Sequence, residues 1–558
     1  MRFKTNTTAV AFAALAAFSL AAVTASGPPA SHDAAVARKL NTFNALVKEL
    51  ELNYVDSIRT DEAFDAAIGA MLSTIDPYTE YYDSESRSDL MKMTTGEYGG
   101  IGSIIMERDG STYISEPMLG SPASRAGLKA GDHIIRVDST DVSHMGSTEV
   151  TRRLRGVPGT NVQIEIVRPY TADSVMVVDI ERGKLVQPSV PFYGTVNDGR
   201  TGYLSLTSFI DKSPEEVRTA LESFKADPKV ENLILDLRGN GGGLVESAVD
   251  IVGYFVPKGT EVVRTRGRDA ASEKIYKTTR TPILPDMPLA VLIDGGSASA
   301  SEITAGALQD LDRAVLIGTR SFGKGLVQST RPLPYDGLLK VTVAKYYIPS
   351  GRLIQALDYS RRNPDGSVAV TPDSLTKVYH TSRGREVRDG GGLKPEITVD
   401  WGKASRLLYN VVRDFWAFDF ATKYASEHPT IPSPAEFEIT DSIYADFKRS
   451  IDPDRFKYDK VCEEMVKQLR ETAEVEGYMS DTTKSLIDSL AVSLTHNLQH
   501  DLDVARPEVS EYLAEEIVTR YYFEPGKIEN RLKTDVGVKR AVEVLSDRKE
   551  YDKLLGKK

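Results

Sequence analysis

The feature that most constrains the fold is a strand, turn, helix and strand pattern between residues 288 and 318. Residues 288–294 form an apolar run typical of a strand, small residues follow, and a helix is expected over residues 299–311. A second apolar run at residues 314–318 predicts a crossover that returns the chain beside its first strand. Ser299 stands at the turn before the helix, where its hydroxyl is exposed and helix amides can stabilise a developing negative charge.

The serines of this turn also fit a purely structural interpretation. Ser299 and Glu302 have the spacing of a capping box, in which a serine and a glutamate satisfy each other's backbone amides. Ser297 and Ser301 fit equally well as small spacers. Taken alone, the serine run favours the capping box, so a nucleophile needs support from other segments.

Lys324, between two glycines, is the candidate proton acceptor because no histidine lies nearby in the sequence. Serine with lysine is a known variant of the nucleophile-base pair. A lysine is protonated at neutral pH, so a base role requires desolvation that lowers its pKa. Its neighbours Phe322, Leu326 and Val327 are apolar, which suits that role, whereas a surface lysine in a glycine turn is the alternative.

A glycine-rich loop supplies a third part of the predicted site. An apolar strand at residues 232–237 precedes Arg238-Gly-Asn-Gly-Gly-Gly243, and an apolar helix follows over residues 244–255. The amides of such a loop can reach a substrate carbonyl. The loop lacks the Lys-Ser/Thr ending of a P-loop, and its glycine spacing does not fit the dinucleotide fingerprint.

Three segments, LILDLRGNGGG, VLIDGGSASASEITAGALQD and GTRSFGKGLVQ, together resemble those of the carboxyl-terminal processing peptidases, or tail-specific proteases, which have a Ser-Lys active site. The resemblance implies that Ser299 is the nucleophile, Lys324 the general base and Gln328 the residue that orients the lysine. It implies an oxyanion hole from the backbone N–H groups of Ala300 and Gly243. Asp310 matches a position that some members need, in a role that is less clear.

Residues 96–183 resemble a PDZ domain, on the segments 98–102, 120–138 and 158–168. PDZ domains add an extended peptide to a sheet edge and capture its terminal carboxylate with loop amides. By analogy, the capturing loop is Gly99, Gly100, Ile101 and Gly102. A small β module without a ligand is the alternative, but its place before a Ser-Lys core indicates recognition of substrate tails.

The expected fold class is multidomain: an α/β core of the Clp/crotonase kind with an inserted, mostly β PDZ domain, a helical N-terminal region and a helical C-terminal domain. A polar insertion at residues 356–388 of the core is expected to form a surface hairpin or a lid-like loop. The expected parts are a signal peptide at 1–25, the helical N-terminal region at 26–95, the PDZ domain at 96–183, the peptidase core at 184–402 and the helical C-terminal domain at 403–558.

The N-terminus predicts the compartment. Arg2 and Lys4 precede an apolar run over residues 9–23, which ends in the small-residue pattern Val23-Thr-Ala25 typical of signal cleavage. We therefore expect export to the periplasm or cell envelope. An uncleaved anchor, with membrane association, is the alternative. Residues 35–90 are expected to be helical, and residues 71–78 resemble the family's N-terminal region, which implies a homodimer through these helices.

Composition excludes several partners. The formal net charge of −11 argues against nucleic acid, and one cysteine with seven scattered histidines predicts no metal. The peptidase that the sequence indicates is expected to need no cofactor. The sequence thus predicts an exported serine endopeptidase that cuts proteins with free C-termini near those ends, through an acyl-enzyme. A non-catalytic PDZ adaptor that binds protein tails is the alternative. An acyl-thioester hydrolase on the same fold is disfavoured because it leaves the PDZ module without a task.

Overall fold

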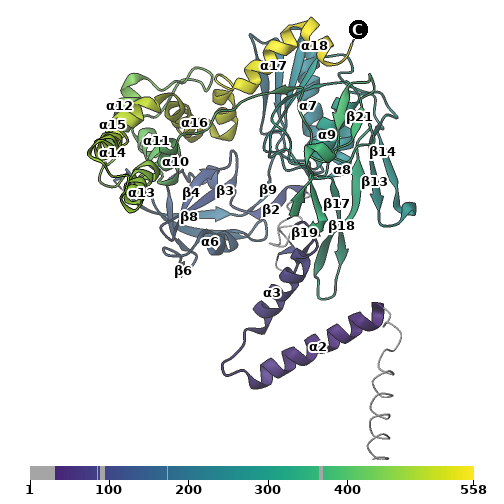
Figure 1. The fold of residues 1–558 in the computed structure, drawn as a ribbon, viewed down its shortest axis with the longest axis horizontal. Helices are drawn as coiled ribbons and strands as arrows, with labels where there is room; N and C mark the ends of the chain where they lie inside the picture. The colour runs from purple at the N-terminus through teal and green to yellow at the C-terminus, as the bar shows by residue number, and fades with distance from the viewer. Residues whose placement is uncertain (1–31, 85, 88–94, 173, 363–367, 558) are drawn as a thin grey trace, which may run out of the picture. The chain divides into compact units, whose positions relative to one another are not determined.

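The computed structural model describes residues 32–84, 86–87, 95–172, 174–362 and 368–557 (Figure 1). The predicted signal peptide at residues 1–25 lies outside this range. The chain divides into two compact units, residues 1–77 and residues 78–558. None of the helices in the described ranges combines the length and apolar character that a membrane span requires.

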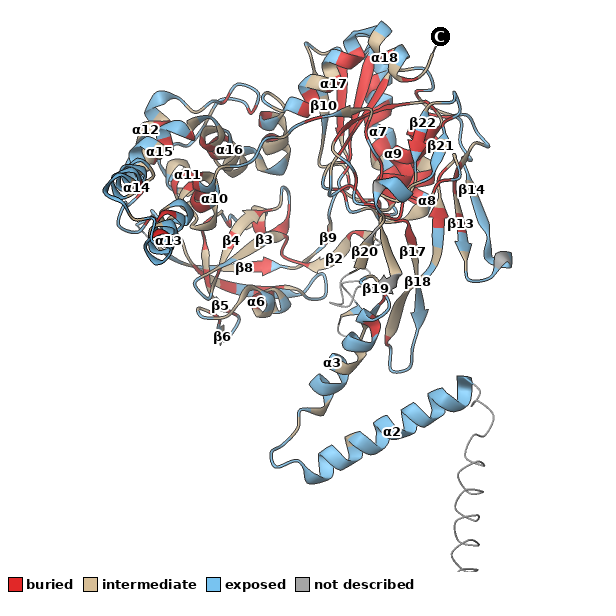
Figure 2. Ribbon diagram, in the orientation of Figure 1, coloured by how far each residue is buried: buried red, intermediate tan, exposed pale blue. Residues whose placement is uncertain are grey.

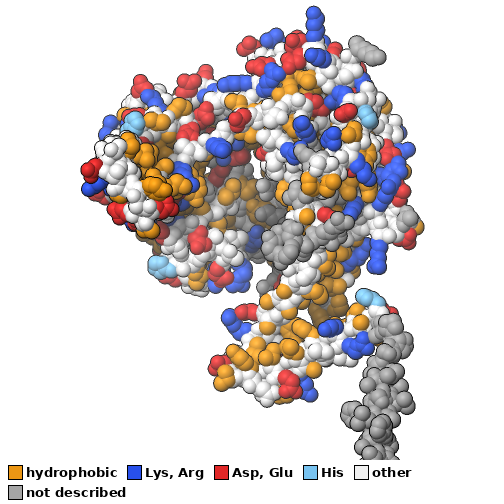
Figure 3. All heavy atoms as spheres, in the orientation of Figure 1, with side chains coloured by type: hydrophobic (Ala, Val, Ile, Leu, Met, Phe, Trp, Pro, Cys, Tyr) orange, Lys and Arg blue, Asp and Glu red, His pale blue; other side chains and the backbone are white. Residues whose placement is uncertain are grey.

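The first unit is a pair of helices, α2 (His32–Asn53) and α3 (Thr60–Ser73), as the sequence predicted. The rings of Phe43 and Phe64 meet edge to face with centroids 5.9 Å apart. No residue of α2 is buried (Figure 2). Figure 3 shows hydrophobic side chains on the surface of this pair, and they include Leu40, Phe43, Leu46, Leu50, Phe64 and Met71.

The core of the second unit is a six-stranded sheet in the order β10-β11-β12-β15-β16-β23. Neighbouring strands are parallel except for β10, which is antiparallel to β11. The predicted strand, helix and strand crossover is confirmed, because β15 and β16 pair in parallel on either side of α9. The strands are β10 (Phe192–Val196), β11 (Thr201–Ser205), β12 (Asn232–Asp236), β15 (Leu289–Ile293), β16 (Val315–Gly318) and β23 (Ile397–Thr398).

Helices cover both faces of this sheet because its strands are apolar on both sides (Figure 2). Leu233 and Leu235 of β12 face the cluster with α7 (Ser213–Ala226), α8 (Val245–Val252) and α9 (Ala300–Asp310). Ile234 faces the other side, which α17 (Val536–Ser546) and α18 (Arg548–Leu554) cover. The last two helices of the expected C-terminal domain thus pack against the peptidase sheet.

A second, antiparallel sheet carries the loop with the candidate base. Its order is β1-β18-β13-β14, and β17 also pairs with β18. The prediction of helix through residue 90 is wrong at β1, because the backbone of residues 80–82 pairs with residues 338–340 of β18. The strands are β1 (Glu80–Tyr82), β13 (Glu261–Gly267), β14 (Lys274–Lys277), β17 (Leu326–Pro332) and β18 (Leu338–Tyr347), with a 3₁₀ turn η1 (Ala270–Ser272).

The expected PDZ module is a separate β domain with its own apolar core. Its main sheet has the order β3-β4-β5-β7-β8, β6 pairs with β5, and β2 pairs with β9. The elements are β2 (Glu97–Gly100), β3 (Ser103–Arg108), β4 (Ser111–Pro117), α5 (Pro122–Arg125), β5 (His133–Val137), β6 (Thr140–Asp141), α6 (Ser147–Leu154), β7 (Asn161–Val167), β8 (Val175–Glu181) and β9 (Gly183–Val186).

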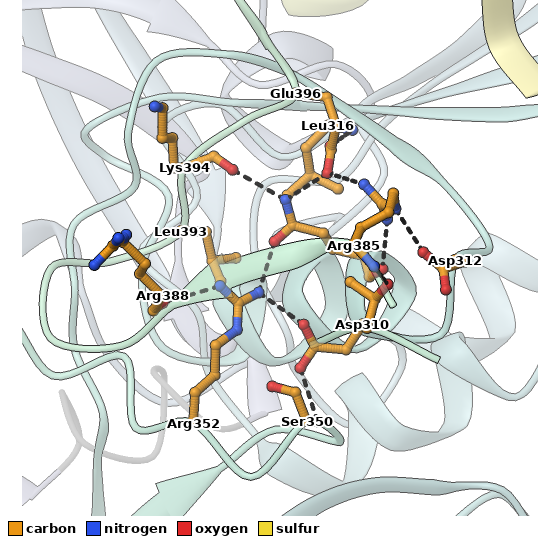
Figure 4. A network of polar contacts seen from close by, with 12 residues as sticks. Asp310, Asp312, Leu316, Ser350, Arg352, Arg385, Arg388, Leu393, Lys394 and Glu396 are labelled. Carbon is orange, nitrogen blue, oxygen red and sulfur yellow. Dashed lines mark hydrogen bonds and ion pairs between the residues drawn. The ribbon is translucent and has the colours of Figure 1, made fainter. Parts of the chain in front are cut away.

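The polar insertion forms two small hairpins rather than one. β19 (Leu357–Arg362) pairs with β20 (Val368–Val370), and after η2 (Asp373–Leu375), β21 (Val378–His380) pairs with β22 (Glu386–Arg388). The second hairpin is fixed to the core by buried polar contacts (Figure 4). Arg385, just before β22, donates to Asp312 Oδ1 and Glu396 Oε1, both at 2.6 Å.

The helical C-terminal region has its own apolar core. Its helices are α10 (Arg406–Arg413), α11 (Trp416–Glu427), α12 (Asp441–Ser450), α13 (Val461–Val475), α14 (Asp481–Ser493), α15 (Leu498–Val504) and α16 (Arg506–Arg531). α16 bends at Phe523, where φ is 57° and ψ is −166°, two residues before Pro525.

Contacts join the β domain to these helices. Arg108 of β3 donates to both carboxylate oxygens of Asp419 on α11, at 2.8 and 2.9 Å. At the bend of α16, the Glu524 N–H donates to Glu116 Oε1 at 3.0 Å. We call this contact region, defined by Arg108, Glu116, Asp419 and Glu524, the seam.

Candidate active site

Ser299 occupies a strained turn at the start of α9. Its φ of 57° and ψ of −114° lie in a region that residues with a side chain seldom adopt. Its N–H donates to Glu302 Oε2 at 2.9 Å, so the glutamate half of the predicted capping box is present. The turn places Ser299 where β15 ends and α9 begins, as the sequence predicted.

The two flanking serines hold the glycine loop in place. Ser297 and Ser301 are fully buried. The Ser297 hydroxyl donates to the Leu237 carbonyl and the Ser301 hydroxyl to the Asn240 carbonyl, both at 2.8 Å. Because both hydroxyls have acceptors in the core, the geometry favours Ser299 over its neighbours as the nucleophile.

The glycine loop approaches Ser299 more closely than a side chain would permit. Gly242 has a φ of 101°, and a Cβ there would lie 2.7 Å from the Cβ of Ser299 and 2.8 Å from the Ala300 nitrogen. Within the described ranges, the N–H groups of Gly243 and Ala300 donate no hydrogen bond. These are the two groups predicted for the oxyanion hole, so both remain available to a substrate oxygen.

Lys324 lies in the loop between β16 and β17 and is half-buried. Its Nζ lies 4.3 Å from the centroid of the Tyr78 ring, and Tyr78 comes shortly before β1. This contact was not predicted, because Tyr78 lies about 250 residues from Lys324 in the sequence.

Glu302 joins the turn of Ser299 to the loop of Lys324. Oε2 accepts hydrogen bonds from the N–H groups of Ser299 and Lys324, both at 2.9 Å. Oε1 accepts from the Gly323 N–H at 2.7 Å and from the Ser321 hydroxyl at 2.5 Å. Burial raises the pKa of Glu302 to about 7, while these hydrogen bonds act in the opposite direction. One fully buried carboxylate thus fixes the spacing of both candidate catalytic residues.

Tyr346 of β18 makes a second link between the same two residues. Its buried hydroxyl lies 2.7 Å from the Lys324 carbonyl and 3.1 Å from the Ser299 carbonyl. Burial raises the pKa of Tyr346 well above its ordinary value, so the phenol keeps the proton that it donates. Sequence reasoning missed this residue, since it stands in an ordinary strand pattern without a distinguishing motif.

Gln328 and Asp310 have other partners in the structure. Gln328 Nε2 donates to Thr342 Oγ1 at 3.2 Å. Asp310 ends α9, roughly 15 Å from its first residue at about 1.5 Å per residue. Its carboxylate accepts from Arg352 at 2.8 Å and from the Ser350 N–H at 2.9 Å (Figure 4). These contacts favour a structural role for Asp310, and the orienting role of Gln328 stays a prediction.

Of the four residues predicted for the carboxylate loop of the β domain, Gly99 and Gly100 lie in β2 and pair with β9, and Ile101 and Gly102 follow that strand. A Cβ on Gly99 would lie 2.1 Å from the Gly156 carbonyl oxygen, and Gly102 has a φ of 75°. The N–H groups of Ile101 and Gly102 donate no hydrogen bond within the described part of the chain.

No cluster of metal-ligating side chains occurs among the residues that the structure describes.

Comparison with known proteins assigns the parts of the chain. Residues 200–368 match the model of Peptidase family S41, residues 89–167 a PDZ domain, and residues 407–545 the C-terminal helical domain of a probable PDZ-protease. A carboxy-terminal-processing protease of Bartonella bacilliformis is 34% identical over 66% of this chain and 83% of its own. The carboxy-terminal processing protease CtpA of Bacillus subtilis is 31% identical over 57% of this chain and 66% of its own.

Solved structures of such proteases also match. The photosystem II D1 C-terminal processing protease is 27% identical, with a TM-score of 0.35 over 63% of this chain and 86% of that chain. The fold and the sequence matches define a serine peptidase with a PDZ domain. The chain belongs to Peptidase family S41, among the carboxy-terminal processing proteases.

Proposed function

We propose that this serine peptidase cleaves proteins near their C-termini with Ser299 as nucleophile and Lys324 as general base. The observation that carries the proposal is the Glu302 carboxylate, whose Oε2 accepts from the N–H groups of both residues at 2.9 Å. This shared acceptor holds a serine on a strained turn beside a half-buried lysine.

The proposed reaction has two halves. The neutral Lys324 amine accepts the Ser299 proton as the oxygen attacks the substrate carbonyl, and the Gly243 and Ala300 N–H groups stabilise the oxyanion. The ammonium then returns the proton to the leaving amine, which leaves an acyl-enzyme. In the second half the amine takes a proton from water as the hydroxide attacks the ester carbon. The ammonium then gives this proton to the departing Ser299 oxygen, which releases the new carboxylic acid and restores both residues.

Cleavage of an unfolded protein with an apolar C-terminal tail tests these assignments. Ser299→Ala and Lys324→Ala should each abolish cleavage. Lys324→Arg should also be inactive although it keeps the charge, because a guanidinium stays protonated. Ser297→Ala is the comparison variant: it loosens the glycine loop by losing the bond to the Leu237 carbonyl, so it should lower cleavage without abolishing it. Near-normal cleavage by Ser299→Ala would show that Ser299 is not the nucleophile. Substantial cleavage by Lys324→Arg would show that Lys324 is not the general base.

The β domain is proposed to select substrates by their terminal carboxylate. The available N–H groups of Ile101 and Gly102 support this, because such amides suit an anion. Amidating the substrate's C-terminus should therefore weaken turnover by the intact enzyme. Equal turnover of amidated and free-acid substrates would reject tail capture.

Two further parts of the proposal concern the N-terminus. Export to the periplasm or cell envelope rests on the signal pattern of residues 1–25, and N-terminal sequencing of the mature protein from fractionated cells tests it. A homodimer through α2 and α3 is supported by their exposed apolar side chains. Light scattering of the purified protein, with Leu40→Glu as the disrupting variant, tests the dimer.

A further inference from the structure

The ring of Tyr78 lies over the amine of the proposed base. Lys324 Nζ is 4.3 Å from its centroid. A cation over an aromatic face is attracted by the ring quadrupole, and a neutral amine gains far less from the same contact. The ring therefore stabilises the ammonium form of Lys324 relative to the neutral amine.

The structure fixes Tyr78 to the strands that follow Lys324. The next residue, Thr79, is buried, and its hydroxyl accepts from the Thr342 N–H at 3.3 Å. β1 then pairs with β18. The Thr342 hydroxyl accepts from Gln328, four residues after the lysine. Tyr78 is thus held on the same hairpin, β17 with β18, whose first strand begins two residues after Lys324.

Tyr359 of the polar insertion packs against Tyr78. The two rings meet edge to face with centroids 5.9 Å apart, and the two hydroxyls lie 3.2 Å apart. The insertion thereby contacts the ring that covers the lysine. This is a specific contact between the polar insertion and the proposed active site.

Other titratable groups touch Lys324 at its backbone. Glu302 of α9 accepts from its N–H, and Tyr346 of β18 donates to its carbonyl. Tyr78, from the segment before β1, contacts the amine itself, and Tyr359 of β19 contacts Tyr78. Tyr78 thus contacts the amine of Lys324, whereas Glu302 and Tyr346 contact its backbone.

We propose that Tyr78 is a positioning residue for Lys324: its ring holds the amine in the site and favours the ammonium form, and so sets the pH at which activity begins. This inference rests on the proposed role of Lys324 as general base. Since a base acts only when neutral, a ring that favours the ammonium moves the rise of activity to higher pH. Tyr359 packs against the ring of Tyr78.

Profiles of kcat/KM against pH for the full-length enzyme and two Tyr78 variants test the inference. Tyr78→Leu keeps apolar cover but has no aromatic face, so its midpoint should fall by roughly 0.5 to 1.5 pH units. Tyr78→Phe keeps the ring over the amine and removes the hydroxyl that contacts Tyr359, so its midpoint should match the wild type. Glu302 is present in all three enzymes, so its titration does not produce the difference.

A Tyr78→Leu midpoint that is unchanged or raised would overturn the inference, whatever the rate at the plateau. Tyr78→Met replaces it if the leucine variant fails to fold, with the same expected shift and the same contrary result. Lys324→Ala separates this inference from the proposed function. If Lys324→Ala is active, Lys324 is not the general base and the proposed function fails. If Lys324→Ala is inactive but the kcat/KM profiles of wild type and Tyr78→Leu coincide, only the proposed role of Tyr78 fails.

Discussion

The peptidase site and the seam each contain a carboxylate whose pKa burial raises to about 7, but the two carboxylates differ in their partners. Glu302 accepts four hydrogen bonds from two loops and is fully buried. Glu116 accepts one, from the Glu524 N–H, and the negative charge of Glu524 raises its pKa further. The first carboxylate links the turn of Ser299 to the loop of Lys324, and the second contacts the bend of α16 through the hydrogen bond from the Glu524 N–H.

This difference shows that a raised pKa alone does not identify a carboxylate that is important for activity. Desolvation is the first cause of the shift in both cases. What separates them is how many donors lose their acceptor when the carboxylate is removed. We therefore expect large effects from changes at Glu302 and small, pH-dependent effects from changes at Glu116.

Glu302→Ala is expected to have the largest effect. It leaves four donors without their acceptor, so the free energy of unfolding should fall by about 4 kcal/mol or more. Activity should also be lost, because the carboxylate no longer fixes the spacing of Ser299 and Lys324. Urea unfolding and kcat/KM measure the two effects. Ser321→Ala removes one of the four donors and also the hydroxyl that accepts from the Leu393 N–H, so as the control it should cost about 1 to 3 kcal/mol. Equal effects of the two variants would contradict the organising role.

Asp310 tests whether a buried carboxylate of the same helix can be structural without being catalytic. Asp310→Ala leaves the Arg352 guanidinium, 2% exposed, without its ion-pair partner and should lower stability by about 3 to 5 kcal/mol. Molecules that remain folded should keep most of their kcat. The double variant Asp310→Leu with Arg352→Met should recover much of the stability. A large loss of kcat with unchanged stability would instead assign Asp310 to the chemistry.

Tyr346→Phe compares the second link between Ser299 and Lys324 with the link made by Glu302. It removes the hydroxyl between the Ser299 and Lys324 carbonyls and keeps the ring. We expect about 1 to 2 kcal/mol of lost stability and a moderate fall in kcat, since the Glu302 link remains. Thermal unfolding and steady-state kinetics at one pH measure these effects. A loss as large as that of Glu302→Ala would show that the tyrosine is the main link.

Glu116→Gln should have the smallest effect, and only at one end of the pH range. The pKa of Glu116 is raised from 4.5 to about 7 in the folded state. Its contribution is therefore complete below pH 4.5 and is lost as the pH rises through 7. Solvent access reduces this contribution to the order of 1 kcal/mol. Between pH 5 and pH 8, the urea midpoint of the wild type should fall more than that of Glu116→Gln. Equal falls would show that Glu116 makes no pH-dependent contribution to stability.

The sequence predicted the parts of the site that are contiguous in the chain. The strand, turn and helix at Ser299 follow from apolar runs and small residues, and the parallel β15 and β16 follow from the crossover rule. Glu302 was identified by its spacing from Ser299, but only as a cap. Its bonds to Gly323 and Lys324 depend on how two loops meet, which local patterns do not encode.

Other features depend on contacts between distant segments. Tyr78 reaches Lys324 because β1 pairs with β18, and a three-residue strand carries little periodic signal. α17 resembles any amphipathic helix, and its sequence does not reveal that its apolar face covers the peptidase sheet. The bend of α16 at Phe523 and the seam depend in the same way on tertiary packing.

Labelling with a fluorophosphonate, which reacts with activated serines, tests the central claim most directly. The rate of label incorporation and the labelled peptide would be measured by mass spectrometry for wild type, Lys324→Ala and Glu302→Ala. The account predicts label on Ser299 in the wild type and labelling slowed at least about 100-fold in both variants, as loss of base or of positioning requires. Label on another serine, or labelling of Ser299 at the wild-type rate in Lys324→Ala, would contradict it.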